Sequence, residues 1–227
     1  RWASQGDILT LDPHAQNEGL NIAASSYVYE PLVQYDKDFQ ITPALATEWE
    51  TPSDTLWRFK IREGVKFHDG SDFTAEDAAF SIQRAMAPTS NFKAYVNGIK
   101  EARAADSHTL EIELEGANPV LLRQLTNVFM MSKAWSESNN TTVPQDFTKN
   151  EETHSARHAM GTGPYKLVSR EVDIRTEYSE HEDWWNKANK VGNVTRIVYT
   201  PISQNATRTA ALLSGENDLV LDPPAQD

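Results

Sequence analysis

Hydrophobic and charged residues alternate in two segments of the chain. Between residues 56 and 62, Trp57, Phe59 and Ile61 would point to one side while the charged residues between them point to the other. The same alternation extends over residues 109–115. Both segments therefore predict strands with one buried face.

A helical pattern follows the first of these strands. Apolar residues recur at helical spacing from Ala75 to Met86. Thr74 precedes them, and Asp77 stands three positions later, as in a capping box. Pro88 ends the pattern because proline removes a backbone donor. We expect a capped amphipathic helix here.

Weaker signals predict the remaining elements. Residues 136–162 are polar and aperiodic, which is typical of a functional or wrapping loop. The mixed order of strands and helices predicts an α/β domain with a smaller β-rich insertion. Further strands are predicted near residues 1–11, 46–50, 164–170, 173–180, 194–201 and 218–221, and the strand at 46–50 would pair with 56–62 across a turn at 52–54. Helices are predicted at residues 20–30 and at 205–214, the latter with Ser203 as its cap and Gly215 at its end. Another helix would begin at Asn118, with Pro119 in the first helical position.

Charge and composition exclude several classes of protein. Among 227 residues, 33 are acidic and 21 basic, so the net charge is −12. This argues against a nucleic-acid binder and against an anionic membrane surface as partner. Cysteine is absent, which excludes disulfides and zinc–thiolate sites. The sequence contains no apolar run of about 18 residues, the length that a membrane-spanning helix needs. It starts at Arg1 without a signal peptide, so we expect a targeting peptide to be removed or to lie outside this sequence.

Candidate catalytic chemistry is sparse. His154 and His158 have the spacing of a metal-binding pair, but third and fourth ligands are not apparent, and solvated loop histidines are the interpretation we favour. Gly161-Thr162-Gly163 runs into Pro164, which predicts a tight turn into a strand and not a phosphate loop. Trp184 and Trp185 could stack on a ligand, although paired aromatics beside strands are more often core. No nucleophile elbow or phosphate-binding motif supports an enzyme.

Three passages resemble a known family. Trp57, Phe59, Phe67, Gly70 and Asp77 belong to a passage that continues to Ser81 and Arg84. The other two are Leu11-Asp12-Pro13-His14 with Tyr29-Glu30-Pro31-Leu32, and Gly161 to Tyr165 followed by Asp183-Trp184-Trp185 and Ala210 to Asp218. They are similar to the family 5 extracytoplasmic solute-binding proteins of ABC importers, a group that includes oligopeptide-, dipeptide- and nickel-binding proteins.

The resemblance implies a two-lobed, periplasmic-binding-protein-like fold of type II, cluster C, of which this chain is the first lobe, with the second lobe absent. The lobe would have a mixed sheet with flanking helices. Its core would comprise residues 1–35 and 162–227, and residues 36–161 would form an inserted β-rich subdomain. The signature residues would be structural, and His14 would not be a metal ligand.

The resemblance also implies where a solute would bind. Relatives use the loop after the first strand, the segment after the first long helix and a later turn, and the loop backbone can pair with an extended ligand. In this sequence the corresponding residues are Asn17, Glu18 and Gly19, then Phe92, Lys93 and Tyr95, and finally Asn127, Val128 and Phe129.

The implied function is capture of a solute outside the cytoplasmic membrane and delivery to a membrane permease, without catalysis, cofactor or metal. A peptide is the first choice of solute; nickel chelates, opines and sugars are alternatives within the family. Two hypotheses of other classes remain open. One is a metallohydrolase that uses His154 and His158, and the other is a sensing module on the same fold.

Overall fold

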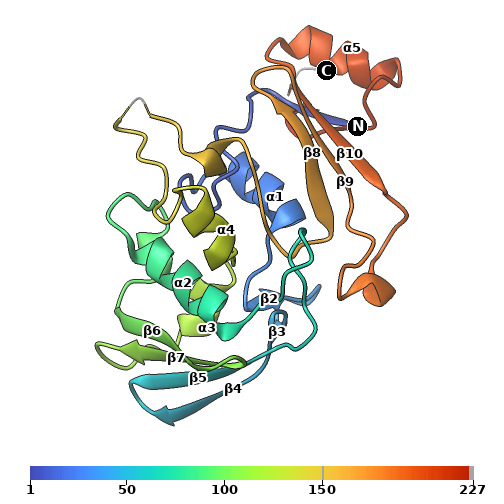
Figure 1. Ribbon diagram of the computed structural model, residues 1–227. Coiled ribbons are helices and arrows are strands. Elements are labelled where there is room, and N and C mark those ends of the chain that lie inside the picture. Colours follow the sequence, from blue (N-terminus) through green and yellow to red (C-terminus); the bar gives the residue numbers. More distant parts are fainter. Residues whose placement is uncertain (150, 225–227) are drawn as a thin grey trace.

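The computed structural model describes residues 1–149 and 151–224. Its first layer is a five-stranded sheet in the order β11-β1-β10-β9-β8, drawn at the upper right of Figure 1. The short N-terminal strand β1 pairs in parallel with β10 and β11, and β9 runs antiparallel to both of its neighbours. These strands are β1 (Trp2–Ser4), β8 (Tyr165–Glu171), β9 (Arg175–Glu180), β10 (Arg196–Pro201) and β11 (Leu219–Val220).

Helix α1 (Gly19–Val28) packs with this sheet in one hydrophobic cluster. Ala24 and Val28 of the helix contribute, together with Trp2, Tyr178 and Tyr199 from the strands. Helix α5 (Asn205–Leu213) precedes β11 and lies at the far end of the sheet in Figure 1. The first and last parts of the described chain therefore share one core.

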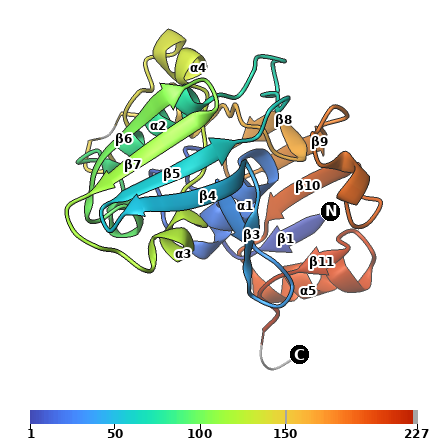
Figure 2. The ribbon, with the colours of Figure 1, turned by 90° about the horizontal axis from the view of Figure 1, so that it is seen from below.

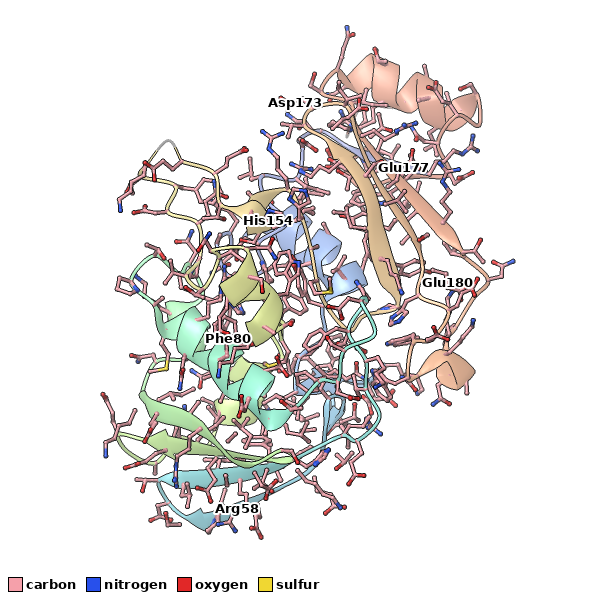
Figure 3. All side chains as sticks on the ribbon, viewed as in Figure 1. Arg58, Phe80, His154, Asp173, Glu177 and Glu180 are labelled. Carbon is pink, nitrogen blue, oxygen red and sulfur yellow. The ribbon has the colours of Figure 1, made fainter. Side chains whose placement is uncertain are left out.

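The second layer is an antiparallel sheet in the order β4-β5-β7-β6, which Figure 2 shows from below. Phe59, Leu110 and Ile112 are buried under helix α2, whereas Arg58 projects from the opposite face (Figure 3). The alternating patterns thus predicted both strands correctly. The elements are β4 (Ala46–Ser53), β5 (Leu56–Ile61), α2 (Ala75–Met86), β6 (Ile99–Asp106) and β7 (Thr109–Leu114).

The cap of α2 is confirmed. Asp77 Oδ2 accepts hydrogen bonds from the backbone N–H and the hydroxyl of Thr74, each at 3.0 Å. The helix ends at Met86, two residues before Pro88. The capping box therefore sets the start of the helix that faces the second sheet.

Shorter elements connect the two layers. A two-stranded sheet consists of β2 (Val33–Tyr35) and β3 (Ile41–Pro43), which lies between the layers in Figure 1. Helices α3 (Leu121–Leu125) and α4 (Lys133–Ser138) follow the second sheet. Single 3₁₀ turns occur at Lys93–Tyr95, His154–Ala156 and Lys187–Asn189.

Several predicted boundaries are wrong. Strand β1 stops at Ser4 because later backbone groups bond elsewhere: the Leu9 N–H donates to the Asn21 side chain at 3.2 Å and the Leu11 N–H to the Ala156 carbonyl at 3.0 Å. Helix α4 ends inside the segment predicted as a loop from residue 136.

Two predicted helix caps are also wrong. The N-cap of α3 is Val120, because Asn118 Oδ1 instead closes a turn with the Val120 N–H at 3.1 Å. The N-cap of α5 is Gln204 and not Ser203.

Strands β2, β3 and β6 were not predicted from the sequence. In β6 the register shifts between Ile99 and Glu101 and again between Ala104 and Asp106. Each shift moves the following side chains to the other face, so no period-two signal survives. None of the helices in the described part of the chain is long and apolar enough to cross a membrane.

Candidate functional site

The first two predicted solute-contacting segments lie against each other. Asn17 Nδ2 donates to the Asn91 carbonyl at 3.3 Å, and the Asn91 N–H donates to the His14 carbonyl at 3.1 Å. The Asn91 side chain also donates to the carbonyl of Ala15. These bonds join the loop before α1 to the turn that leads into Phe92.

The third segment joins the same cluster. His14 Nε2 lies 2.9 Å from the Phe129 carbonyl oxygen. The helix that precedes this segment is also close, since Gln124 Nε2 donates to the Ala94 carbonyl at 3.5 Å. All three segments therefore converge around the loop that contains His14, although they are separated by up to 112 positions in the sequence.

The nine predicted residues differ in what they expose. Asn17, Glu18, Gly19 and Lys93 are exposed, and Tyr95 and Asn127 are half-buried. In contrast, Phe92, Val128 and Phe129 are only 1%, 0% and 5% exposed and belong to the hydrophobic clusters. Among the first six, Gly19 can meet a solute only with its backbone and the other five can do so with their side chains. The last three are buried in the hydrophobic core beneath them.

The segment before α1 offers unpaired backbone donors. Glu18 has extended dihedrals (φ −107°, ψ 146°) and serves as the N-cap, without a side-chain capping bond. Within residues 1–149 and 151–224, no acceptor is found for the N–H groups of residues 16–19. An extended backbone with free donors at a helix N-terminus can pair with an extended ligand or bind a carboxylate.

A buried ion pair between Asp12 and Arg84 connects the loop that contains His14 to helix α2. Arg84 Nη1 and Nη2 donate to the two carboxylate oxygens of Asp12 at 2.7 and 2.6 Å, and both side chains are fully buried. Burial alone would raise the pKa of Asp12, but the charge and hydrogen bonds of Arg84 lower it to about 2. Asp12 Oδ2 also accepts from Ser155 Oγ at 2.9 Å.

A second buried carboxylate, that of Glu30, lies shortly after the end of α1. Glu30 accepts hydrogen bonds from the indole N–H groups of Trp184 and Trp185 and from the Thr162 hydroxyl at 2.8 Å. Burial raises the pKa of Glu30 to about 7 against these three donors. Arg62 lies over the Trp185 ring, 4.2 Å from its centroid. Both tryptophans are half-buried partners of Glu30, in agreement with a structural role.

The Gly161-Thr162-Gly163 segment crosses the end of α1 at very short range. A Cβ at residue 161 would lie 2.0 Å from the Val28 carbonyl oxygen, and one at residue 163 would lie 2.7 Å from it. The Gly163 N–H donates to that same oxygen at 2.8 Å. Glycine is required here by close backbone contact, which the predicted tight turn did not anticipate.

The histidine pair weighed as a metal site is brought together by the fold. The His154 and His158 rings stack with centroids 3.9 Å apart, and the His154 ring centroid lies 5.3 Å from that of Trp135 in α4. His158 Nδ1 lies 3.1 Å from the His154 carbonyl oxygen. In the part of the chain that the structure describes, no group of three or more His, Asp or Glu residues could hold a metal ion.

The network of Asp12, His14 and Arg84 was not predicted from the sequence, in which these residues counted only as members of the family's passages. Arg84 lies 72 positions from Asp12, so no local spacing indicates their contact. One signal was available in the sequence: Arg84 lies within the predicted amphipathic helix. An arginine that such a helix buries requires a partner of opposite charge or a hydrogen-bond acceptor.

Comparisons with known proteins identify the fold. Glutathione-binding protein GsiB of Escherichia coli is 27% identical over 220 residues, covering 95% of this chain and 40% of the relative. Heme-binding protein A of Haemophilus influenzae is 30% identical over 96% of this chain and 43% of its own length. The periplasmic binding protein DppA of Helicobacter pylori, solved in complex with the peptide STSA, superimposes with a TM-score of 0.81 at 26% identity, over 98% of this chain and 46% of that one.

The chain thus spans about two fifths of the length of the curated relatives it matches. A family model described as bacterial extracellular solute-binding proteins, family 5 Middle, matches residues 40–227. Because that match covers most of the sequence, the chain belongs to the family 5 bacterial extracellular solute-binding proteins.

Proposed function

We propose that this chain is the first lobe of the solute-binding component of an ABC importer. It captures a small solute outside the cytoplasmic membrane and delivers it to a membrane permease, without chemical conversion. The observation that carries the proposal is the convergence of the three segments that we expect to contact the solute, on a fold matched by a peptide-bound relative.

On this proposal residues 1–35 and 162–227 form the core of the lobe, and residues 36–161 form the inserted β-rich subdomain. The distribution of strands supports the division. Every strand of the five-stranded sheet lies within residues 2–4 or 165–220, and every strand of the four-stranded sheet lies within residues 46–114. A second lobe completes the site, since the matched relatives are more than twice as long.

A peptide fits the exposed chemistry best. The free N–H groups of residues 16–19 can pair with a peptide backbone. Glu18 and Lys93 carry exposed charges of opposite sign on segments that lie together, which suits a ligand with both an amino and a carboxylate group. Solutes named for the relatives, a peptide for DppA and glutathione for GsiB, have both groups.

The test is calorimetric titration of the full-length protein with trialanine, glutathione, a nickel–histidine complex and mannopinic acid. We expect trialanine or glutathione to bind with a Kd of about 1 μM or tighter. Glu18→Gln and Lys93→Met should each weaken binding by about tenfold, through loss of one charged hydrogen bond. Lys37→Met is the matched control, because Lys37 is exposed in the loop between β2 and β3, and it should leave Kd unchanged.

Two results would argue against the proposal. Absence of binding for the whole panel would remove the transport function. Preferential binding of the nickel complex or of mannopinic acid would keep the function and replace the peptide by a metal chelate or an opine.

The first lobe alone should bind about a hundredfold more weakly than the complete protein, because a single lobe cannot enclose the ligand.

A further inference from the structure

The completely buried His14 side chain contacts two of the three converging segments, and His14 precedes the third segment in the same loop. Its Nε2 lies 2.9 Å from the Phe129 carbonyl oxygen, and its ring packs edge-on against Phe92 with centroids 5.9 Å apart. Its own carbonyl accepts the Asn91 N–H at 3.1 Å. His14 lies only three residues before Asn17, so it joins the loop backbone to the other two segments.

Hydrogen-bond chemistry determines the tautomer of this imidazole. Arg84 Nη1 lies 3.2 Å from His14 Nδ1, and a guanidinium can only donate, so Nδ1 must be the acceptor. The carbonyl of Phe129 can only accept, so Nε2 must carry the hydrogen. The ring is therefore a neutral bridge with one donor and one acceptor, both used.

The surroundings also keep the ring neutral. Burial is the main cause that lowers the pKa of His14, the positive charge of Arg84 lowers it further, and Asp12 opposes these effects only in part, so that the pKa is about 3. Arg84 and Asp12 are the charged groups that face the ring. The bridge therefore keeps the same hydrogen bonds across the physiological pH range.

We propose that His14 is a positioning residue of the solute site: its imidazole, oriented by Arg84, holds the segment that ends in Phe129 at a constant distance from the loop that presents Asn17 to Gly19. The inference rests on the proposed function. It adds a role for a buried residue that touches no solute. Loss of the Nε2 hydrogen bond should let the two segments separate.

Two substitutions distinguish positioning from general packing. In His14→Gln the amide nitrogen reaches the place of Nε2 and can still donate to the Phe129 carbonyl. In His14→Asn the shorter side chain reaches only the place of Nδ1, so it can accept from Arg84 but cannot reach Phe129. We expect trialanine affinity in the full-length protein to fall by about tenfold in His14→Asn and to stay within about threefold in His14→Gln, measured well below both unfolding transitions.

A measurement without ligand tests the same geometry. The Met130 N–H donates to the Glu30 carbonyl at 2.9 Å and follows Phe129 directly. Its hydrogen exchange should rise by about tenfold in His14→Asn but not in His14→Gln. The Ile61 N–H, bonded to the His108 carbonyl at 2.7 Å in the second sheet, is the control and should exchange equally in both variants.

The outcomes separate the inference from the proposed function. If the wild-type protein binds no solute of the panel, the proposed function fails, and exchange at Met130 still decides the role of His14. If solute binds and the two variants have equal affinity and equal exchange at Met130, the positioning role is overturned. A nitrogen NMR spectrum that shows His14 with the hydrogen on Nδ1 would also overturn it.

Discussion

His68 and His181 share one acceptor, the carbonyl oxygen of Gly163, and a ring nitrogen of each lies 3.1 Å from it. Their ring centroids are 4.9 Å apart. His68 lies in the turn after β5, and His181 directly follows β9. The shared bond therefore connects the part of the chain that carries the four-stranded sheet to the five-stranded sheet.

This pair predicts loss of stability in acid. Because His68 donates through Nε2, its buried Nδ1 is unprotonated and has no partner within the described residues. Burial lowers the pKa of His68 to about 3 from 6.5, and the pKa of His181 is also lowered by burial. With a lowered pKa in the folded state, the stabilising contribution is complete above pH 6.5 and is lost as the pH falls from 6.5 toward 3.

Urea unfolding should measure this loss. Between pH 6.5 and about pH 5, His68 should contribute a decrease of about 2 kcal/mol in the free energy of unfolding. His68→Gln places an amide nitrogen where Nε2 lies, so it retains a donor for the Gly163 carbonyl but cannot be protonated. Its decrease should therefore be smaller by about that amount. His108→Asn, in the turn between β6 and β7, is the control and should behave as the wild-type protein does. A decrease that is identical in all three proteins would contradict the prediction.

Glu30 has the opposite pH dependence. Burial raises its pKa to about 7 from 4.5, so the folded state binds the proton more tightly than the unfolded state. Its stabilising contribution is complete below pH 4.5 and is lost as the pH rises through 7. Glu30→Gln cannot ionise. Relative to the wild-type protein, the variant should therefore gain about 2 kcal/mol between about pH 5 and pH 7.5, in paired urea titrations. A constant difference between the two proteins at all pH values would exclude an ionisable role for Glu30.

The close contact at Gly161 predicts a strong effect of one methyl group. Gly161→Ala would place Cβ 2.0 Å from the Val28 carbonyl oxygen, which forces the backbone to move. We expect a loss of about 3 kcal/mol or more in stability. Gly116→Ala is the matched control, because no atom lies within 4 Å of its added Cβ. Thermal unfolding followed by circular dichroism compares the two variants, and equal midpoints would refute the close-contact argument.

Breaking the ion pair of Asp12 and Arg84 should cost more than breaking any exposed pair. Asp12→Asn leaves the guanidinium fully buried without its counter-charge, at a cost of about 3–5 kcal/mol. Asp38→Asn removes the partner of Lys37 in an exposed pair and should change stability by less than about 1 kcal/mol. Denaturant midpoints in the two variants test this contrast. Similar losses would mean that the buried pair adds nothing beyond a surface contact.

Local pattern predicted the elements whose side chains alternate or repeat without interruption. Phe59 and Leu110 define buried strand faces, and Thr74 with Asp77 defines a helix start, because these signals depend only on neighbouring residues. The same method missed β6, where two register shifts remove the alternation. It also extended β1 beyond Ser4, since the partners of Leu9 and Leu11 could not be read from adjacent sequence.

The candidate site was likewise predicted only in part from the sequence. Resemblance to a family nominated nine residues in three segments, and the fold brings those segments together. The resemblance did not indicate that Phe92 and Val128 are buried, or that the Asn17 side chain donates a hydrogen bond to the Asn91 carbonyl. Burial and contact depend on how segments far apart in the chain pack, so no residue's neighbours in sequence determine them.

From its sequence alone, then, this protein is an acidic α/β chain with a capped helix, two amphipathic strands and the passages of a solute-binding family. Only the tertiary structure decided that Asp12 and His14 meet Arg84, that Glu30 meets two tryptophans, and that Gly161 touches α1. The physical reason is that propensity and capping act over a few residues. The burial of a charge, in contrast, is tolerated only where long-range packing supplies its partner.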